Sequence, residues 1–192
     1  MNPVLLDFPD SFNTERLTIR APRQGDGAEI AQAVHESLND LRPWMPWAKE
    51  EPSAEQQESR IRKGLADWLT RTNLLLHLYL TGTGAFVGGS GLHRFDWRVR
   101  KFEIGYWVRT KFAGQGYITE AVNGITAFAF THLHANRVEI RCDAKNVRSA
   151  AVARRCGFLL EGVLRNEALS VDGELRDTLV FSKINPTEFH RG

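Results

Sequence analysis

The stretch Glu103-Ile-Gly-Tyr-Trp-Val-Arg-Thr-Lys-Phe-Ala-Gly-Gln-Gly-Tyr-Ile-Thr119 decides how the rest of the chain is interpreted. From Glu103 to Val108, large apolar side chains alternate with other residues, which is the period of a half-buried strand. From Ile118 onward the apolar residues recur at helical spacing, which predicts an amphipathic helix. A short basic loop that contains Gly114 and Gly116 joins the strand to the helix.

This turn from strand to helix predicts a site for a phosphate. Unpaired backbone N–H groups gather at a helix N-terminus, where the helix dipole favours negative charge. Gly114 and Gly116 let the backbone close on a phosphate where a Cβ atom would block the approach. The third glycine of a dinucleotide fingerprint is missing, and so is the Gly-Lys-Ser/Thr of a nucleoside-triphosphate loop. The alternative interpretation is a tight turn that binds nothing.

A second strand and helix follow in the C-terminal half of the chain. Arg137 to Cys142 alternate as a strand does, and Asn146 stands where an N-cap residue belongs. The helix after Asn146 is predicted to end at Gly157, with Phe158 packing back on its last turn. The chain therefore repeats the order strand, polar turn, helix.

Taken together, these two units resemble the GNAT superfamily of acyl-CoA-dependent N-acetyltransferases. Within it, the chain is similar to the ribosomal-protein N-terminal acetyltransferases of the RimJ/RimL type. The likeness runs from Thr14-Glu-Arg-Leu to Phe181. It is carried by Arg42-Pro-Trp-Met-Pro-Trp47, Glu103-Ile-Gly-Tyr-Trp107, Gly116-Tyr-Ile-Thr-Glu-Ala121 and the segment from Asn146 to Phe158.

The resemblance implies an enzyme that uses acetyl-CoA as co-substrate and moves the acetyl group directly to a primary amine. The N-terminal amine of a ribosomal protein is one such acceptor, and an acetyltransferase for small-molecule amines is the alternative. A non-catalytic module that binds acyl-CoA is a third interpretation. The intact glycines, Asn146 and Ser149 favour an enzyme over that module.

The fold implied by the resemblance is α+β. Its central sheet is mixed, mostly antiparallel and splayed open between its fourth and fifth strands, with about four helices around it. The pantetheine arm would lie in the gap between Lys101–Val108 and Arg137–Cys142. The remaining patterns predict strands at Arg16–Ala21, Leu74–Leu80 and Phe86–Leu92. They predict a further strand after Phe158 to about Asn166, a turn at Asp172-Gly173 and a last strand to about Lys183. Helices are predicted from Gln24 to about Leu38 and from Ser53 to about Arg71.

Composition sets limits that agree with this interpretation. The 192 residues, 42% of them hydrophobic, predict a single domain over 1–192 with a core at about 14–183. A net charge of +2 is too mild to indicate nucleic-acid binding. No signal peptide and no membrane-spanning run is visible, so we expect a cytoplasmic protein with no membrane partner. The sequence leaves open whether the chain forms a homodimer.

Neither the cysteines nor the histidines of the sequence indicate a metal site or a covalent intermediate. Cys142 and Cys156 are interpreted as small buried hydrophobes in a reducing compartment. His132 and His134 lack a third ligand at suitable spacing, so no metal is predicted.

Direct transfer needs a base for the amine, a donor for the developing oxyanion and a proton for the departing thiolate. Glu103 is the predicted base because it shares a strand face with Gly105 and Trp107; Glu139 and Glu167 are the alternatives. Ser149 matches the serine of the family's Asn-x-x-Ser segment, and the resemblance implies that it supplies the proton. Plain helix capping is the other interpretation of Ser149.

The coenzyme and acceptor sites are also predicted from the resemblance. Ala113 stands where many members carry Gln or Arg, and Ile118 stands where Gly or Ala is usual, so Arg109 and Lys111 are expected to supply the missing charge. The predicted coenzyme residues are Trp107, Val108, Arg109, Lys111, Gly114, Gln115, Gly116, Tyr117, Ile118, Thr119, Asn146 and Ser149. The predicted acceptor residues are Trp44, Trp47 and His93, with Trp97 nearby; a hydrophobic plug between the first two helices is the alternative for the two tryptophans of the loop.

Overall fold

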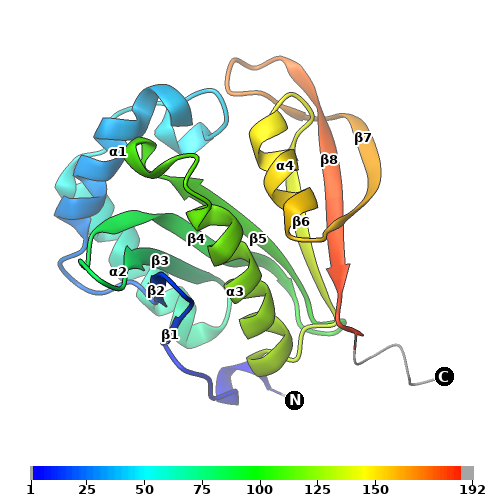
Figure 1. Ribbon diagram of the computed structural model, residues 1–192, viewed down its shortest axis with the longest axis horizontal. Helices are drawn as coiled ribbons and strands as arrows, with labels where there is room; N and C mark the ends of the chain where they lie inside the picture. The colour runs from blue at the N-terminus through cyan, green and yellow to red at the C-terminus, as the bar shows by residue number, and fades with distance from the viewer. Residues whose placement is uncertain (1, 187–192) are drawn as a thin grey trace.

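The computed structural model describes residues 2–186, which form one eight-stranded sheet with four α-helices (Figure 1). The strands lie in the spatial order β1-β2-β3-β4-β5-β6-β8-β7. The helices are α1 (Gly27–Leu41), α2 (Ala54–Thr70), α3 (Tyr117–His132) and α4 (Val147–Arg155). The strands are β1 (Ser11–Asn13), β2 (Leu17–Arg20), β3 (Leu74–Leu80), β4 (Phe86–Asp96), β5 (Lys101–Val108), β6 (Arg137–Asp143), β7 (Leu159–Leu169) and β8 (Leu175–Ile184).

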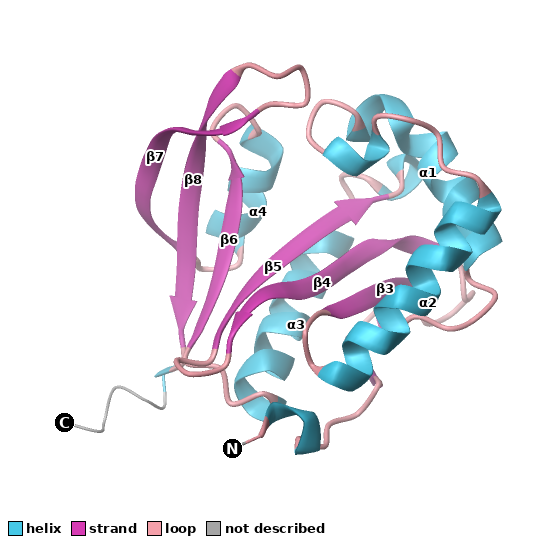
Figure 2. Ribbon diagram, turned by 180° about the vertical axis from the view of Figure 1, so that it is seen from behind, coloured by secondary structure: helices cyan, strands magenta, loops and turns pink. Residues whose placement is uncertain are grey.

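The sheet opens between β5 and β6, its only parallel pair in the described chain. These two strands pair at Lys101–Arg137, Phe102–Val138 and Glu103–Glu139, and there the pairing stops. Beyond Glu103 the strands diverge, so that the two halves of the sheet form a V (Figure 2). The predicted α+β fold and the predicted position of the splay are both confirmed.

One short strand was missed by the sequence patterns. The predicted first strand, Arg16–Ala21, is β2, and β1 precedes it and pairs with it antiparallel from Ser11 to Asn13. Three residues are too few to show a period of two, which is why the pattern gave no signal. The splayed strands are therefore the fifth and sixth of this chain, although they are the two that were predicted.

The two faces of the sheet are covered differently. Trp107 of β5 packs with Phe86 and with residues of α1 and α2 such as Val34 and Ile61; we call this side the Glu103 face. Tyr106 of β5 packs on the opposite side, with the core under α3 and α4; we call it the Tyr106 face. Figure 2 shows that α1 and α2 reach only as far as β4 and β5. Among the described residues, no helix covers the Glu103 face of β6, β8 and β7.

Local sequence signals explain where the helices begin and end. Ser53 and Gln56 form a capping box at the start of α2. Asn146 caps α4 by accepting a hydrogen bond from the N–H of Ser149 at 3.0 Å. Gly157 follows α4 with φ +73°, a conformation that favours glycine. None of the helices among residues 2–186 is long and apolar enough to cross a membrane.

A buried polar network ties the start of α1 to the sheet. The Asp26 carboxylate accepts hydrogen bonds from both Arg20 Nη atoms, at 2.9 and 2.8 Å, and from His77 Nδ1 at 3.1 Å. Arg20 also donates to Tyr79 Oη at 2.7 Å. Burial alone would raise the pKa of Asp26, but the hydrogen bonds from His77 and Arg20 outweigh it and hold that pKa well below its ordinary range.

We expect Asp26→Asn to lower the free energy of unfolding by about 3 kcal/mol near neutral pH, because it leaves the largely buried guanidinium of Arg20 without its charged partner. The lowered pKa of Asp26 stabilises the fold above about pH 4, and this contribution is lost as the pH falls through the folded-state pKa. The stability difference between wild type and variant should therefore shrink below about pH 4. Urea unfolding across this range measures it, with the exposed Asp10→Asn as control. A difference that stays constant down to low pH would contradict the account.

Candidate active site

The glycine loop has the geometry of an anion site. Gly114 and Gly116 take φ +75° and +82°, which non-glycine residues rarely adopt. Gly116 is the N-cap of α3 and offers no side chain to the first turn. Among the described residues, the N–H groups from Gly114 to Thr119 donate no hydrogen bond to a protein acceptor. The first turn of α3 thus presents donors and a positive dipole end to an anion.

Arg16 stands beside this loop, and the sequence patterns gave it no role. Its guanidinium lies 4.4 Å from the centre of the Tyr117 ring and donates to the carbonyl of Gln115 at 3.1 Å. Its Nε donates to Glu120 at 2.7 Å, and Glu120 also accepts from the hydroxyl of Thr14. These contacts fix the loop and the start of α3 to the N-terminal segment. They place the guanidinium of Arg16, which is paired with Glu120 but 43% exposed, next to the glycines.

The charge expected from Arg109 is not available at the loop. The Arg109 guanidinium is buried and makes two hydrogen bonds to Glu36 on α1, at 2.6 and 2.5 Å. The expectation that Arg109 supplies charge to the coenzyme is therefore wrong for its side chain, because that charge is already paired. Lys111 remains exposed, with its Nζ 5.4 Å from the centre of the Phe112 ring.

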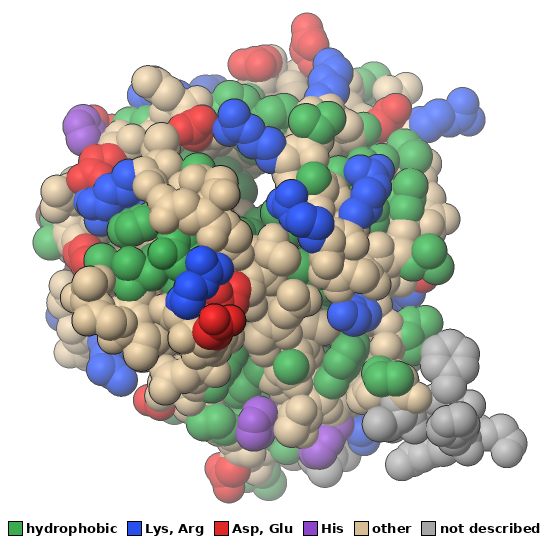
Figure 3. Space-filling view, viewed as in Figure 1, with side chains coloured by type: hydrophobic (Ala, Val, Ile, Leu, Met, Phe, Trp, Pro, Cys, Tyr) green, Lys and Arg blue, Asp and Glu red, His purple; other side chains and the backbone are tan. Residues whose placement is uncertain are grey.

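Figure 3 shows where positive side chains gather on the face that carries the starts of α3 and α4. A hollow lies between the part of the molecule that holds α1 to α3 and the part that holds α4, and Lys and Arg side chains stand around it. The gap between β5 and β6 opens on the same side (Figure 1). A polyanionic ligand with a narrow arm would match these two features.

Ser149 lies at the mouth of the gap, held from both sides. It is the third residue of α4, and its N–H bonds to Asn146, as helix capping requires. Its Oγ lies 3.0 Å from Tyr106 Oη, which comes from β5 across the gap. Burial raises the pKa of the Tyr106 hydroxyl, so that group stays protonated and available as a donor. The Tyr106–Ser149 contact was not predicted, although a buried tyrosine needs a partner for its hydroxyl.

The two cysteines do not contribute a nucleophile. Cys142 and Cys156 are both buried and unpaired. Burial raises the pKa of each thiol, which disfavours the thiolate. Among the described residues, no group of three or more His, Cys, Asp or Glu side chains could hold a metal ion.

Glu103 lies on the other side of β5 from Tyr106. Its Oε1 is 3.2 Å from His93 Nε2 on β4, and its Oε2 is 3.4 Å from Arg94 Nη1. The Glu103 side chain is only 11% exposed, whereas that of His93 is 36% exposed. Sequence reasoning placed both residues at the site, and the structure joins them into one pair.

The two alternative carboxylates are already engaged. Glu139 is buried and accepts from Arg137 Nε at 2.7 Å. Glu167 accepts from Thr178 at 2.9 Å and from Arg141 at 2.6 Å. The hydrogen bond from Thr178 lowers the pKa of Glu167, which makes it a weaker base.

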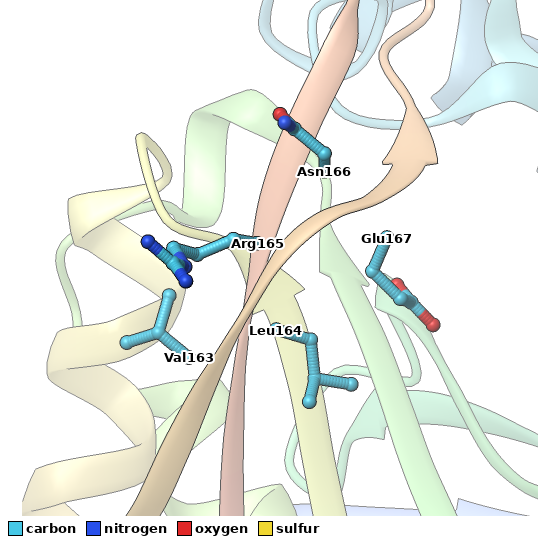
Figure 4. A pocket seen from close by; sticks show the side chains of 5 residues that line it. All are labelled: Val163, Leu164, Arg165, Asn166 and Glu167. Atoms are coloured by element: carbon cyan, nitrogen blue, oxygen red, sulfur yellow. The ribbon is translucent and has the colours of Figure 1, made fainter.

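Glu167 belongs to a bowed part of β7 that lines a cavity of about 670 Å³. The register between β7 and β8 shifts between Leu164 and Ala168. Figure 4 shows Val163 and Arg165 pointing to one side of the strand, with Leu164 and Glu167 on the other.

The tryptophans predicted at or near the acceptor site lie in different parts of the structure. Trp47 packs edge-on against Trp107 with ring centres 5.8 Å apart, inside the cluster between α1, α2 and the sheet. Trp44 is 37% exposed. Trp97 lies on the Tyr106 face, where it contacts Phe102, so it is not beside His93. Trp47 therefore matches the hydrophobic plug, and the expected position of Trp97 is wrong.

Comparisons with known proteins agree with this geometry. A family profile described as Acetyltransferase (GNAT) domain matches residues 16–159. YdaF of Bacillus subtilis (strain 168), which carries the provisional name of a ribosomal N-acetyltransferase, is 34% identical over 88% of this chain and 91% of its own. The ribosomal-protein-serine acetyltransferase of Escherichia coli (strain K12) is 27% identical over 79% of this chain and 84% of its own. The microcin C7 self-immunity acetyltransferase MccE, solved with acetyl-CoA and AMP, shares the fold with a TM-score of 0.84 at 24% identity, over 92% of this chain and 97% of its own.

We expect Gly116→Val to abolish acetyl-CoA binding while the protein stays folded. A β-branched side chain at φ +82° adds strain of about 1–2 kcal/mol and stands at the first turn of α3. Gly84→Val is the matched control, because Gly84 also has positive φ, at +69°, but lies in open space at the β3–β4 turn. Calorimetry should show lost affinity in the first variant only. Unchanged affinity in a folded Gly116→Val protein would refute the assignment of this loop.

Proposed function

The chain belongs to the GNAT acetyltransferase family, and on that premise we propose that its acceptor is the N-terminal amine of a protein, with ribosomal proteins the first candidates. Family membership confirms the resemblance carried by the glycine loop and the Asn146 segment. The protein is an acetyl-CoA-dependent N-acetyltransferase.

The observation that carries the proposal is the uncovered Glu103 face of the sheet. The strands β6, β8 and β7 continue that face beyond the gap without a helix over them (Figure 2). An acceptor that extends away from its amine, as a polypeptide does, would have room along these strands. Partly exposed ion pairs, of Arg137 with Glu161 and of Arg141 with Glu167, lie on this surface and offer polar contacts to a peptide.

The relatives support the same class of acceptor. The E. coli protein is named for acetylating a serine of a ribosomal protein, and the B. subtilis protein is named as a ribosomal N-acetyltransferase. Ribosomal proteins are made and assembled where ribosomes are, so the proposal includes a cytoplasmic location. The two unpaired cysteines support this location, because thiols stay reduced in the cytoplasm.

The residues around the gap fit acetyl-CoA. Gly116, at positive φ, leaves open the first turn of α3, and the N–H groups of residues 114–119 are free to bind the pyrophosphate. When bound, acetyl-CoA supplies an activated thioester carbonyl that an amine attacks. Ser149 is proposed to give its hydroxyl proton to the departing sulfur, and Tyr106 to hold that hydroxyl in place.

The proposed groups for the two proton transfers lie on opposite faces of β5. Tyr106 projects to one face and meets Ser149, whereas Glu103 projects to the other and meets His93. An acetyl group in the gap would be reached by the amine from the Glu103 face while its sulfur lies toward α4. The acceptor and the coenzyme would then approach without competing for space.

We expect peptides with a free N-terminal Ser or Ala to be acetylated with higher kcat/KM than polyamines, aminoglycosides or free amino acids. Release of the coenzyme thiol measures the rate for each acceptor. The same peptides with a blocked N-terminus and an internal lysine are the control, and they should give no turnover. Higher kcat/KM for a small amine than for every peptide would overturn the proposed acceptor class.

We expect Ser149→Ala to lower kcat by about a hundredfold and to change acetyl-CoA affinity little, because thiolate protonation matters mainly in the transition state. Tyr106→Phe should lower kcat in the same direction but by less, since it removes the hydrogen bonds from Tyr106 Oη to the carbonyl and Oγ of Ser149 and leaves the Ser149 hydroxyl itself in place. Steady-state kinetics and calorimetry separate the two effects, and the exposed Ser59→Ala serves as control. Equal losses of rate and affinity in Ser149→Ala would leave it as a capping residue only.

A further inference from the structure

The hydrogen bond between His93 and Glu103 has a defined donor and acceptor. An ionised carboxylate only accepts hydrogen bonds, so Nε2 of His93 must carry the proton that lies between them at 3.2 Å. In the neutral imidazole the other ring nitrogen, Nδ1, is then an acceptor. Among the described residues, Nδ1 of His93 makes no hydrogen bond or ion pair. His93 thus combines a fixed tautomer with an unused basic nitrogen.

The imidazole ring lies over the strand that borders the gap. A Cβ atom at Gly105 would stand 2.8 Å from His93 Cε1, so the ring occupies the space that Gly105 leaves empty. Gly105 is the second residue of β5 beyond Glu103, where the pairing with β6 has already ended. The free nitrogen of His93 is therefore held beside the open part of the gap, on the face from which an acceptor would arrive.

From this geometry we propose that His93 is the general base that takes the proton of the acceptor amine, and that Glu103 is a positioning residue that orients the ring. The proposal rests on the proposed function and deepens it. Glu103 itself is the less accessible group, with 11% of its side chain exposed against 36% for His93, and it already bonds to His93 and Arg94. The carboxylate stabilises the imidazolium that forms.

The step balances without another reactant. The amine nitrogen loses a proton to Nδ1 of His93 as it forms its bond to the carbonyl carbon. The bond from that carbon to sulfur breaks, and its electron pair leaves with the sulfur, which takes up the hydroxyl proton of Ser149. The Ser149 alkoxide then takes a proton back from water, and the imidazolium of His93 gives its proton to the hydroxide that remains, so both residues return to their starting states.

The charged groups around His93 come from four strands. Arg94 is its neighbour on β4, and Glu103 faces it from β5. Glu139 on β6 is the register partner of Glu103 and is paired with Arg137. Arg94 also acts electrostatically on Glu167 of β7. Within the described chain, Glu103 is the only titratable or charged group that makes a direct hydrogen bond or ion pair with His93.

The test compares His93→Ala with rescue by added imidazole. We expect kcat to fall by about a hundredfold or more, acetyl-CoA affinity to stay unchanged, and imidazoles to restore the rate in order of their basicity. Glu103→Gln should lower kcat by less and should not respond to imidazole. The matched control is His35→Ala, because His35 forms an exposed pair with Glu51 at 2.6 Å on the surface of α1; it should keep the wild-type rate and show no rescue.

Gly105→Ala probes the position of the ring without touching either titratable group. Its Cβ would displace the imidazole, so kcat should fall while the melting temperature changes little. His93→Gln, which is closer in size, replaces His93→Ala if the alanine variant does not fold. Retention of most of the wild-type rate in the His93 variant, or a larger loss in Glu103→Gln than in that variant, overturns the proposal.

Two design features keep this test separate from the proposed acceptor class. The kinetics use whichever amine the wild-type enzyme acetylates fastest, so a wrong acceptor class does not affect the comparison. Nitrogen NMR of the imidazole gives a readout without turnover. We expect His93 to show the tautomer with the proton on Nε2, and Glu103→Gln to lose this preference; a proton on Nδ1 in the wild-type protein overturns the proposal.

Discussion

The hydrogen bonding between β5 and β6 stops at Glu103 and Glu139, and the site depends on this interruption. A continuous sheet would bury the backbone of Ile104 to Val108 in a ladder and leave no passage between the two faces. Because the ladder ends, the parts of the chain before and after the gap can each place side chains at its rim. The crossing contact from Tyr106 to Ser149 then joins β5 to α4 where strand pairing no longer does. Other contacts hold the elements beside this gap in place. The ion pair of Arg109 with Glu36 anchors the end of β5 to α1. Glu120 anchors the start of α3 to Thr14 and Arg16.

The alternation of side chains along β5 divides the chemistry between two faces. Consecutive residues of a strand point to opposite sides, so Glu103 and Tyr106 cannot serve the same side of the gap. The Tyr106 face carries the helix starts, the glycine loop and the capped serine, all suited to a negatively charged coenzyme. The Glu103 face carries a histidine held by a carboxylate and then an open surface with partly exposed ion pairs. A direct transfer between two substrates uses such a division, because the substrates must meet at one carbon atom and otherwise stay apart.

Signals that reside in one segment were readable from the sequence, and contacts between distant segments were not. The alternation in β5, the glycines at positive φ, the capping box at Ser53 and the cap at Asn146 each follow from neighbouring residues, and the structure confirms them. The splay was predicted only through the resemblance, since no local pattern says where two strands part. Arg109 looked like a free loop cation because its partner Glu36 lies 73 residues away in the chain. The meeting of Tyr106 with Ser149 and the side of the sheet taken by Trp97 depend on packing in the same way.

The central claim is that acetyl transfer takes place inside the gap, with the acceptor on the Glu103 face and the sulfur beside Ser149. A crystal structure with a conjugate that joins a short peptide through its N-terminal nitrogen to coenzyme A tests this most directly. The account predicts that the pantetheine arm passes between β5 and β6, that the sulfur lies near Ser149 Oγ, and that the peptide leaves along the uncovered face past His93. A conjugate whose peptide lies on the Tyr106 face, or whose arm avoids the gap, would contradict it.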